Sequence, residues 1–288
     1  MKIEKILILG NLSRAKVNNT VKTFKPWLEK KVKSVEVINI AEDSDDKLLK
    51  KTCLNADIGV VLGGDGAILA ACRRLGENQI PLVGIHLGNF GFLTELTLKD
   101  VYPYMENILN GKYRLSSRVV LTCSVIRESK IVMESIGVND VVISRSSLSR
   151  LISIQVTIDG DEIAHYRSDG IIVSTPIGST AHNLAAGGPI LVPELRAFII
   201  TPICPHTLTN RPLVIHSDAK IELKVLSASS GVGVTVDGQV YVDLCEGDVV
   251  SVEKSDLQLQ LIDTKTRTFY GVLREKLNWA GHPQYAKN

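Results

Sequence analysis

Nearly continuous apolar runs alternate with helix-like stretches over the first 115 residues of this 288-residue chain. The runs are KILILG at 5–10, SVEVINI at 34–40, DIGVVLGG at 57–64 and IPLVGIHLG at 80–88, and the stretches between them are 17–32, 44–53 and 66–76. Strands that are apolar on both faces are typical of parallel sheets covered by helices, and parallel neighbours need a crossover that is usually helical. The pattern therefore predicts an α/β, Rossmann-like domain with a mostly parallel sheet at residues 1–115.

The following residues, 116–267, are predicted to form a β-rich domain. β-Branched runs with alternating polarity replace the helices, as in LISIQVTIDGDEIAHYR at 151–167 and GVGVTVDGQVYVDL at 231–244. Asp159-Gly160 and Asp237-Gly238 interrupt these runs, and an Asp-Gly pair between alternating strands is a strong hairpin signal.

Two segments depart from this β pattern. The Ala- and Gly-rich STAHNLAAGGP at 179–189 predicts a short helix that Ser179 or Thr180 caps and Gly187-Gly188-Pro189 ends. The tail at 268–288 looks partly helical, and we expect it to pack back on the first domain.

Composition narrows the class of protein. A formal charge of +2 gives no basic field that would indicate nucleic acid binding, and the lysines of KTFKPWLEKKVK at 22–33 are expected on a solvated helix face. Five scattered cysteines without a C-x-x-C pair argue against a disulfide framework or a zinc site. The start of the chain lacks a cleavable leader pattern, and no apolar run is long enough for a membrane span. We therefore expect a soluble, cytoplasmic protein without membrane association.

The loop Gly63-Gly64-Asp65-Gly66 follows the third apolar run and opens a helix-like stretch. Glycines at a strand-to-helix turn leave backbone N–H groups and the positive end of the helix dipole open to a phosphate. The loop lacks the Lys-Ser/Thr of a Walker A motif and the spacing of G-x-G-x-x-G. A carboxylate in such a cradle indicates phosphoryl transfer, in which Asp65 holds nucleotide-bound Mg²⁺ or accepts the proton of an attacking hydroxyl. The alternative is a glycine turn in which Asp65 caps the helix.

The chain resembles the NAD kinases from about residue 56 to residue 214. The Gly-Gly-Asp-Gly loop itself is shared with the diacylglycerol and sphingosine kinases. The stretches that resemble NAD kinases in particular are GIHLGNFGFLTEL at 84–96, GVNDVVISR at 137–145, SDGIIVSTPIGSTAHNLAAGGPI at 168–190 and TPICPHTLTNRPLV at 201–214. The resemblance implies a two-domain enzyme that transfers a phosphoryl group from ATP, or in some members polyphosphate, to the 2′-hydroxyl of the adenosine ribose of NAD.

The resemblance also implies roles for single residues. Asp65 matches the aspartate that acts on the 2′-hydroxyl, and the loop glycines match the phosphate cradle for ATP, with Gly66 also beside NAD. The cradle glycines are Gly63, Gly64 and Gly66. The other residues implied at the NAD site are Phe92 beside the adenine, Asn139 and Asp140 at the ribose and adenine, Asp169 near the nicotinamide, and Thr180, Ala181 and His182 in a segment that is Thr-Ala-Tyr in the family.

Plainer interpretations exist for each of these features. An Asn-Asp pair is common in turns, a lone Phe is more often a core residue, and residues 179–189 fit a simple capped helix. Histidines 86, 165, 206, 216 and 282 show no metal-ligand spacing, so no metal bound by the protein's own side chains is expected.

Three positions depart from the family pattern, namely Ala67 for Thr, His182 for Tyr and Ala185 for Ser. Each change removes a hydroxyl, so we expect an active enzyme with altered substrate affinity. The resemblance further implies Mg²⁺ supplied with ATP, NAD bound between the two domains, and a homodimer or homotetramer. The alternatives are a lipid kinase that shares the Gly-Gly-Asp-Gly loop and an NAD(P)-binding sensor that has lost turnover through the three departures.

Overall fold

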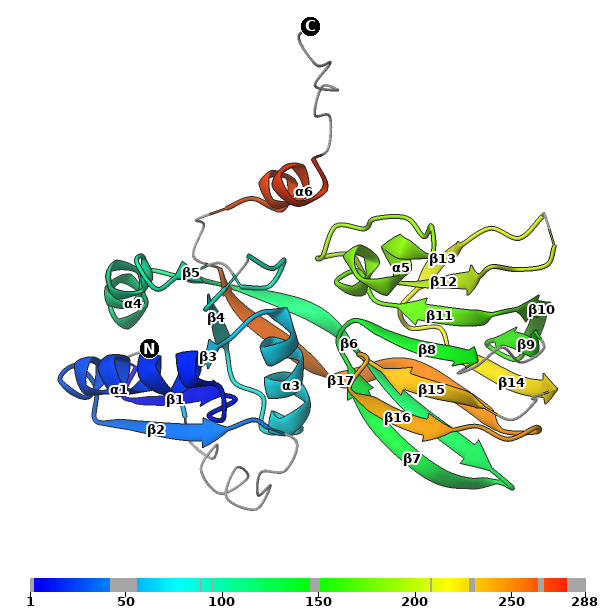
Figure 1. The fold of residues 1–288 in the computed structure, drawn as a ribbon, viewed down its shortest axis with the longest axis horizontal. Coiled ribbons are helices and arrows are strands. Elements are labelled where there is room, and N and C mark those ends of the chain that lie inside the picture. The colour runs from blue at the N-terminus through cyan, green and yellow to red at the C-terminus, as the bar shows by residue number, and fades with distance from the viewer. Residues whose placement is uncertain are drawn as a thin grey trace, which may run out of the picture. The chain divides into compact units, whose positions relative to one another are not determined.

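The computed structural model in Figure 1 describes residues 3–41, 56–88, 90–94, 96–145, 151–207, 209–227, 231–263 and 267–278. Contacts within the chain divide it into two compact units. The first unit comprises Met1–Ala71, Ile80–Leu115 and Leu261–Asn288, and the second comprises Cys72–Gln79 and Ser116–Gln260. Each unit has a hydrophobic core of its own.

A parallel sheet forms the centre of the first unit. Its strands lie in the order β2-β1-β3-β4, and β5 and the end of β17 each pair with β4. The bounds are β1 Lys5–Gly10, β2 Ser34–Asn39, β3 Ile58–Leu62, β4 Leu82–His86 and β5 Leu96–Thr97, and β17 is Val249–Asp263. β3 and β4 are buried along their whole length, as expected for strands covered on both faces. The predicted α/β fold with a parallel sheet is confirmed.

The helices of the first unit are α1 (Ala15–Glu29), α3 (Asp65–Leu75), whose last turn is grouped with the second unit, α4 (Val101–Leu109) and α6 (Phe269–Leu277). α1 buries Val17, Thr20, Phe24 and Leu28, which share one face at helical spacing, while Lys22 and Lys30 are exposed. The predicted solvated lysine face is thus confirmed. The predicted helix at 44–53 lies outside the described residues, and no helix within the described ranges is long and apolar enough to cross a lipid bilayer.

Antiparallel strands make up most of the second unit, which confirms the predicted β-rich half. One set contains the neighbours β10-β9-β14-β17 and the pair β6-β7, and the other is a sheet with the order β13-β12-β11-β8-β15-β16. The first set is β6 Arg114–Arg127, β7 Lys130–Gly137, β9 Ile152–Ile158, β10 Asp161–Ser168 and β14 Ile221–Ser227. The second is β8 Asp140–Arg145, β11 Gly170–Ser174, β12 Ala197–Ile203, β13 Leu213–His216, β15 Val232–Val236 and β16 Val240–Asp243.

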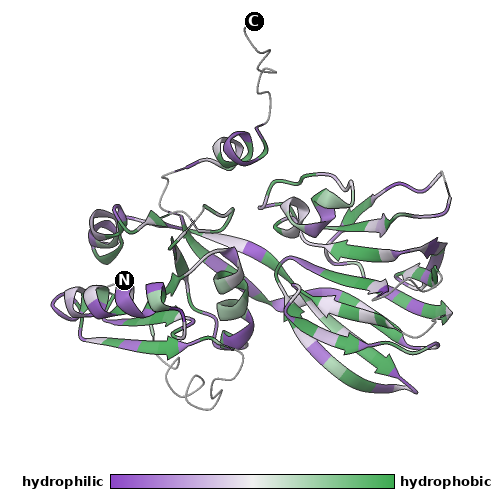
Figure 2. Ribbon diagram, viewed as in Figure 1, coloured by the Kyte–Doolittle hydropathy of each residue, from purple (hydrophilic) through white to green (hydrophobic). Residues whose placement is uncertain are grey.

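Side chains of both sets meet in one core. Ile154 and Leu223 come from the first set, and Ile143, Ile171 and Phe198 come from the second. The unit is therefore a sandwich in which each strand turns its apolar residues inward. Figure 2 shows these strands coloured largely as hydrophobic.

Both predicted Asp-Gly hairpins are present. Asp159 and Gly160 connect β9 to β10 with φ of 51° and 91°, and Asp237 and Gly238 connect β15 to β16 with φ of 53° and 64°. Positive φ at both central residues matches the right-handed twist of the flanking strands, which explains the preference for Asp-Gly.

The predicted helix at 179–189 is present but shorter, as a 3-10 turn η1 (Gly178–Thr180) followed by α5 (His182–Ala185). Neither Ser179 nor Thr180 caps it, so that prediction was wrong. The Ser179 hydroxyl is fully buried, donates to Pro176 O at 2.6 Å and accepts from Leu191 N at 3.0 Å. The hydroxyl therefore satisfies two main-chain groups of the surrounding loops. Gly187 has a φ of 83° just after the helix, as expected for a C-terminal stop.

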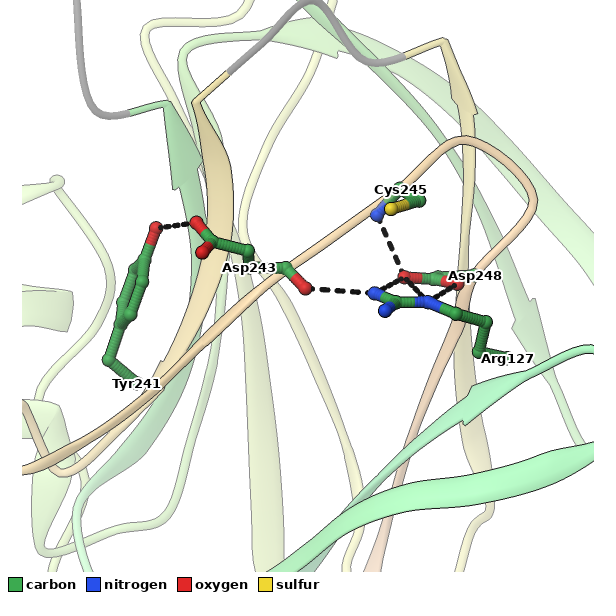
Figure 3. A network of polar contacts seen from close by, with 5 residues as sticks. All are labelled: Arg127, Tyr241, Asp243, Cys245 and Asp248. Carbon is green, nitrogen blue, oxygen red and sulfur yellow. Dashed lines mark hydrogen bonds and ion pairs between the residues drawn. The ribbon is translucent and has the colours of Figure 1, made fainter.

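An ion pair between the half-exposed Arg127 and the buried Asp248 closes the turn before β17 (Figure 3). The side chain of Asp248 is 2% exposed and accepts from Arg127 Nε at 3.0 Å, from Arg127 Nη2 at 2.7 Å and from Cys245 N at 2.8 Å. Arg127 Nη2 also donates to Asp243 O at 3.0 Å. Hydrogen bonding to Arg127 is the main cause that lowers the pKa of Asp248, and it ties the end of β6 to the β16–β17 turn.

Replacing Asp248 with Ala should destabilise the protein by about 2–4 kcal/mol, because the change removes a buried acceptor of charged hydrogen bonds. Chemical denaturation measured by circular dichroism at pH 7 tests this. Glu246→Ala changes an exposed carboxylate in the same turn and is the matched control. Equal midpoints for the two variants would contradict the assigned role of the ion pair.

Candidate active site

The Gly-Gly-Asp-Gly loop lies at the carboxyl edge of the parallel sheet. β3 ends at Leu62, Gly63 N donates to Ile85 O of the neighbouring β4 at 3.0 Å, and α3 begins at Asp65. A Cβ on Gly63 would lie 2.6 Å from Ala67 Cβ, so the turn is too tight for a side chain there. At Gly64 a Cβ would meet nothing within 4 Å, which leaves this side of the loop open. Such an edge, with a helix N-terminus beside it, is where open α/β sheets bind anionic ligands.

Asp65 connects this loop to a second one. Its carboxylate accepts from Phe92 N at 2.6 Å and Leu93 N at 3.0 Å, and more weakly from Thr94 Oγ1 at 3.3 Å. The approach is close because residue 91 is glycine, whose Cβ would lie only 1.7 Å from Asp65 Oδ1. The carboxylate is therefore fixed by main-chain donors 27 and 28 positions away.

Phe92 lies beside this carboxylate and contacts the C-terminal helix of the same unit. The ring centroids of Phe92 and Phe269 are 6.5 Å apart, and Lys276 Nζ is 5.4 Å from the Phe92 ring. The ring is partly exposed, so Phe92 is not the fully buried core residue of the plainer interpretation. The first unit thus brings together the predicted residues of the glycine loop, Asp65 and Phe92.

In the second unit, Asn139 directly precedes β8 and Asp140 begins it, and β8 is an inner strand between β11 and β15. Ser174 of β11 is opposite Asp140 on one side, and Val236 of β15 is opposite Val141 on the other. Asn139 O accepts from Thr175 N at 2.8 Å, and a Cβ on Gly178 would lie 2.1 Å from the same oxygen. The Asn-Asp pair and the segment that leads to His182 are therefore in direct contact.

Asp140 is a buried carboxylate, 5% exposed. Burial, and secondly the charge of Asp237, raise the pKa of Asp140 to about 7. A carboxyl group with such a pKa changes charge near neutral pH, which is common at functional sites.

Thr180, Ala181 and His182 lie on η1 and at the start of α5. Thr180 is half-buried and His182 is exposed, while the next residue, Asn183, is fully buried. Asn183 Nδ2 donates to Ser179 O at 3.2 Å and to Pro189 O at 3.1 Å, and its Oδ1 accepts from Thr201 Oγ1 at 2.7 Å. The buried side chain of Asn183 therefore fixes the main chain of residues 179–189, while the imidazole of His182 is exposed to solvent.

Asp169 is not close to the other predicted residues of its unit. It precedes β11, whose other end is Ser174, so about 16 Å of extended chain separates the two. Its carboxylate forms an ion pair with Arg145 Nη2 at 2.8 Å.

Two residues of this region escaped sequence reasoning, namely Asn183 and Asp237. Asp237 was interpreted only as a hairpin residue, yet its carboxylate accepts from the amides of residues 138, 139 and 140. The Asp-Gly signal explains the turn and contains nothing about partners almost 100 positions away. Within the described ranges no group of three or more His, Cys, Asp or Glu side chains could hold a metal ion.

Two family profiles match the chain over most of its length. The ATP-NAD kinase N-terminal domain matches residues 6–113, and the ATP-NAD kinase C-terminal domain matches residues 138–264. The second match favours an NAD kinase over a lipid kinase that shares only the glycine loop.

Relatives named NAD kinase are similar along about four fifths of their length or more. The protein of Citrifermentans bemidjiense is 44% identical over 241 residues, which is 83% of each chain. That of Geobacter metallireducens is 43% identical over 78% of this chain and 79% of its own. The Koribacter versatilis protein is 37% identical over 95% and 98%. Relatives that carry the name NAD kinase at this identity favour an enzyme over a sensor that has lost turnover.

Solved structures share the fold. A yeast NADH kinase complexed with NADH superposes with a TM-score of 0.88 at 24% identity, covering 100% of this chain and 91% of the other. An NAD kinase from Archaeoglobus fulgidus in complex with ATP gives 0.75 at 25% identity, covering 96% and 100%. Together with the profiles and the relatives, these similarities show that the chain belongs to the NAD kinase family and phosphorylates NAD with ATP to give NADP.

Proposed function

We propose that Asp65 is the catalytic residue and that it acts on the 2′-hydroxyl of the adenosine ribose of NAD. The observation that supports this is the fixed position of its carboxylate, held by Phe92 N and Leu93 N beside the open side of the glycine loop. A positioned acceptor removes much of the entropic cost of orienting an attacking hydroxyl.

In this mechanism the 2′-oxygen attacks the γ-phosphorus of ATP. The new O–P bond forms while the bond to the β,γ-bridging oxygen breaks, ADP leaves, and the hydroxyl proton passes to the Asp65 carboxylate. The amides around Gly64 and Gly66, at the N-terminal end of α3, bind the phosphates. Mg²⁺ belongs to the substrate as MgATP and neutralises charge on the phosphates, since no described cluster of acidic side chains would hold the ion alone.

The second unit supplies the remaining contacts to NAD. Its Asn139 and Asp140 bind the ribose and adenine, and its Thr180, Ala181 and His182 line the nicotinamide side. Phe92 of the first unit stacks beside the adenine. Ala67, His182 and Ala185 lack the hydroxyl groups of the family residues at these positions. This difference changes the affinity for the substrates and does not affect Asp65.

We also propose a homodimer or homotetramer in the cytoplasm. Asp169 lies at the far end of β11 from Ser174, so a role beside the nicotinamide is met more easily by Asp169 of a second subunit. Use of polyphosphate as a second donor depends on the shape of the phosphate site and is tested by replacing ATP in the assay.

Asp65→Asn should lower kcat at least about 100-fold while NAD binding persists, because the amide cannot accept the hydroxyl proton. NADP formation from NAD and MgATP is measured with an NADP-specific dehydrogenase, and NAD binding is measured by calorimetry. Asp100→Asn, at an exposed aspartate of the same unit, is the control. Wild-type kcat in the Asp65 variant would refute the assignment.

Gly91→Ala should reduce kcat/KM by roughly 10- to 100-fold, because the added Cβ overlaps Asp65 Oδ1 and displaces the carboxylate. Gly88→Ala is the matched control, since a Cβ at Gly88 meets nothing within 4 Å. Steady-state kinetics and thermal melts of both variants separate displacement from unfolding. Equal kcat/KM in the two variants would mean that the position of Asp65 does not limit the reaction.

Asp140→Asn should make the ligand-free protein more stable than the wild type at pH 8 while raising the KM for NAD. The pKa of Asp140 is about 7 in the folded protein and ordinary, about 4, in the unfolded chain, so the folded state binds the proton more tightly. Its contribution to stability is therefore lost as pH rises from about 4 to 7. Thermal melts between pH 4 and pH 8 should show the two proteins diverging over this range. Parallel curves would contradict the raised pKa.

A further inference from the structure

Asp237 is a turn residue whose side chain has a second set of partners. Its carboxylate accepts from Val138 N at 3.0 Å, Asn139 N at 2.7 Å and Asp140 N at 3.2 Å. The main-chain Asp237 N also donates a hydrogen bond to Asp140 O at 2.9 Å. Three consecutive amides that converge on one carboxylate form an anion-binding concavity, here filled from within the protein.

The hairpin alone does not require this carboxylate. Asn would meet the positive φ of 53° at position 237 equally well. An amide, however, offers one acceptor oxygen and no charge, whereas a carboxylate offers two acceptor oxygens to the three N–H groups. The choice of Asp over Asn therefore indicates a function at the start of β8.

Burial and the neighbouring donors act in opposite directions on Asp237, and the net effect raises its pKa. Burial raises the pKa of Asp237, while the amides of residues 138–140 and the charge of Arg73 lower it. Arg73 lies in the last turn of α3 and donates to Gln239 Oε1, two residues after Asp237. Cys72 beside it is a neutral thiol, since burial raises its pKa to about 12. Asp140 is the one described acid of β8 that faces Asp237, and the charge of Asp237 helps to raise the pKa of Asp140.

We propose that Asp237 is a positioning residue for NAD, which fixes the backbone of Asn139 and Asp140 so that their side chains meet the ribose and adenine. The inference rests on the proposed binding role of that pair. Thr175 N donates to Asn139 O at 2.8 Å, so the main chain of the pair is held both by Asp237, which follows β15, and by Thr175, which follows β11. Loss of the hydrogen bonds from Asp237 weakens NAD binding and leaves the phosphate site unchanged.

Asp237→Asn should raise the KM for NAD about tenfold, with kcat and the KM for ATP close to wild type, because charge-assisted bonds to the amides are lost. Asp243→Asn, at an exposed aspartate on the adjacent β16, is the matched control and should leave all three constants unchanged. A wild-type KM for NAD in a folded Asp237 variant would overturn the inference, and so would an equal loss for both substrates.

Asn139→Ala separates this inference from the proposed function. If Asn139→Ala leaves the KM for NAD unchanged, the binding role of the pair fails and the positioning inference fails with it. If Asn139→Ala raises the KM and Asp237→Asn does not, the inference alone fails.

Amide exchange in the ligand-free protein gives a readout that does not depend on activity. The amides of Val138, Asn139 and Asp140 should exchange faster in Asp237→Asn than in the wild type, while those at the centre of β8 keep their protection. The pH below which NAD binding weakens should also move lower, since one cause of the raised pKa of Asp140 is removed. Unchanged exchange at the three amides, or an unchanged pH profile, would contradict the inference.

Discussion

A carboxylate that accepts main-chain N–H groups from a distant segment is the interaction on which this structure depends most. Asp57 binds Glu4 N at 2.7 Å and Lys5 N at 2.8 Å at the start of β1, Asp65 binds the loop after β4, and Asp237 binds the start of β8. In each case the acceptor is short and its partners are amides with fixed directions. The bond therefore sets a backbone position with little side-chain freedom, which is what a binding site requires.

Much of the fold follows from patterns within a few residues of each position. Continuous apolar runs predicted the buried β3 and β4, and Asp-Gly pairs predicted both hairpins, because these features depend on local dihedral angles and on burial of whole strands. The roles of Ser179 and Asn183 could not be predicted in this way. Their partners are loop carbonyls and Thr201, which come close only once the sandwich has formed.

In the candidate site, too, some residues could be predicted from local sequence and others depend on contacts between distant segments. Asp65 and the Asn139-Asp140 pair could be selected from motifs because their neighbours in sequence are part of the signal. Their partners in space could not be selected in this way. No motif predicts that Phe92 N donates to Asp65 or that Asp237 accepts from the pair. Asp140 also illustrates a cost that the sequence does not show, since burial beside a second acid opposes its charge in the ligand-free protein. The binding role proposed for Asp140 would thus come at the expense of stability.

The buried side chain of Asn183 affects which neighbouring positions of this enzyme can be substituted without loss of the fold. Because its buried amide secures the main chain between Ser179 and Pro189, the side chains of His182 and Ala185 point to solvent and add little to the fold. Substitutions at these two positions are then close to neutral for folding and fall directly on the surface proposed for the nicotinamide side. In the proposed binding mode, selectivity between oxidised and reduced dinucleotides can therefore change at these two positions without a change in the fold.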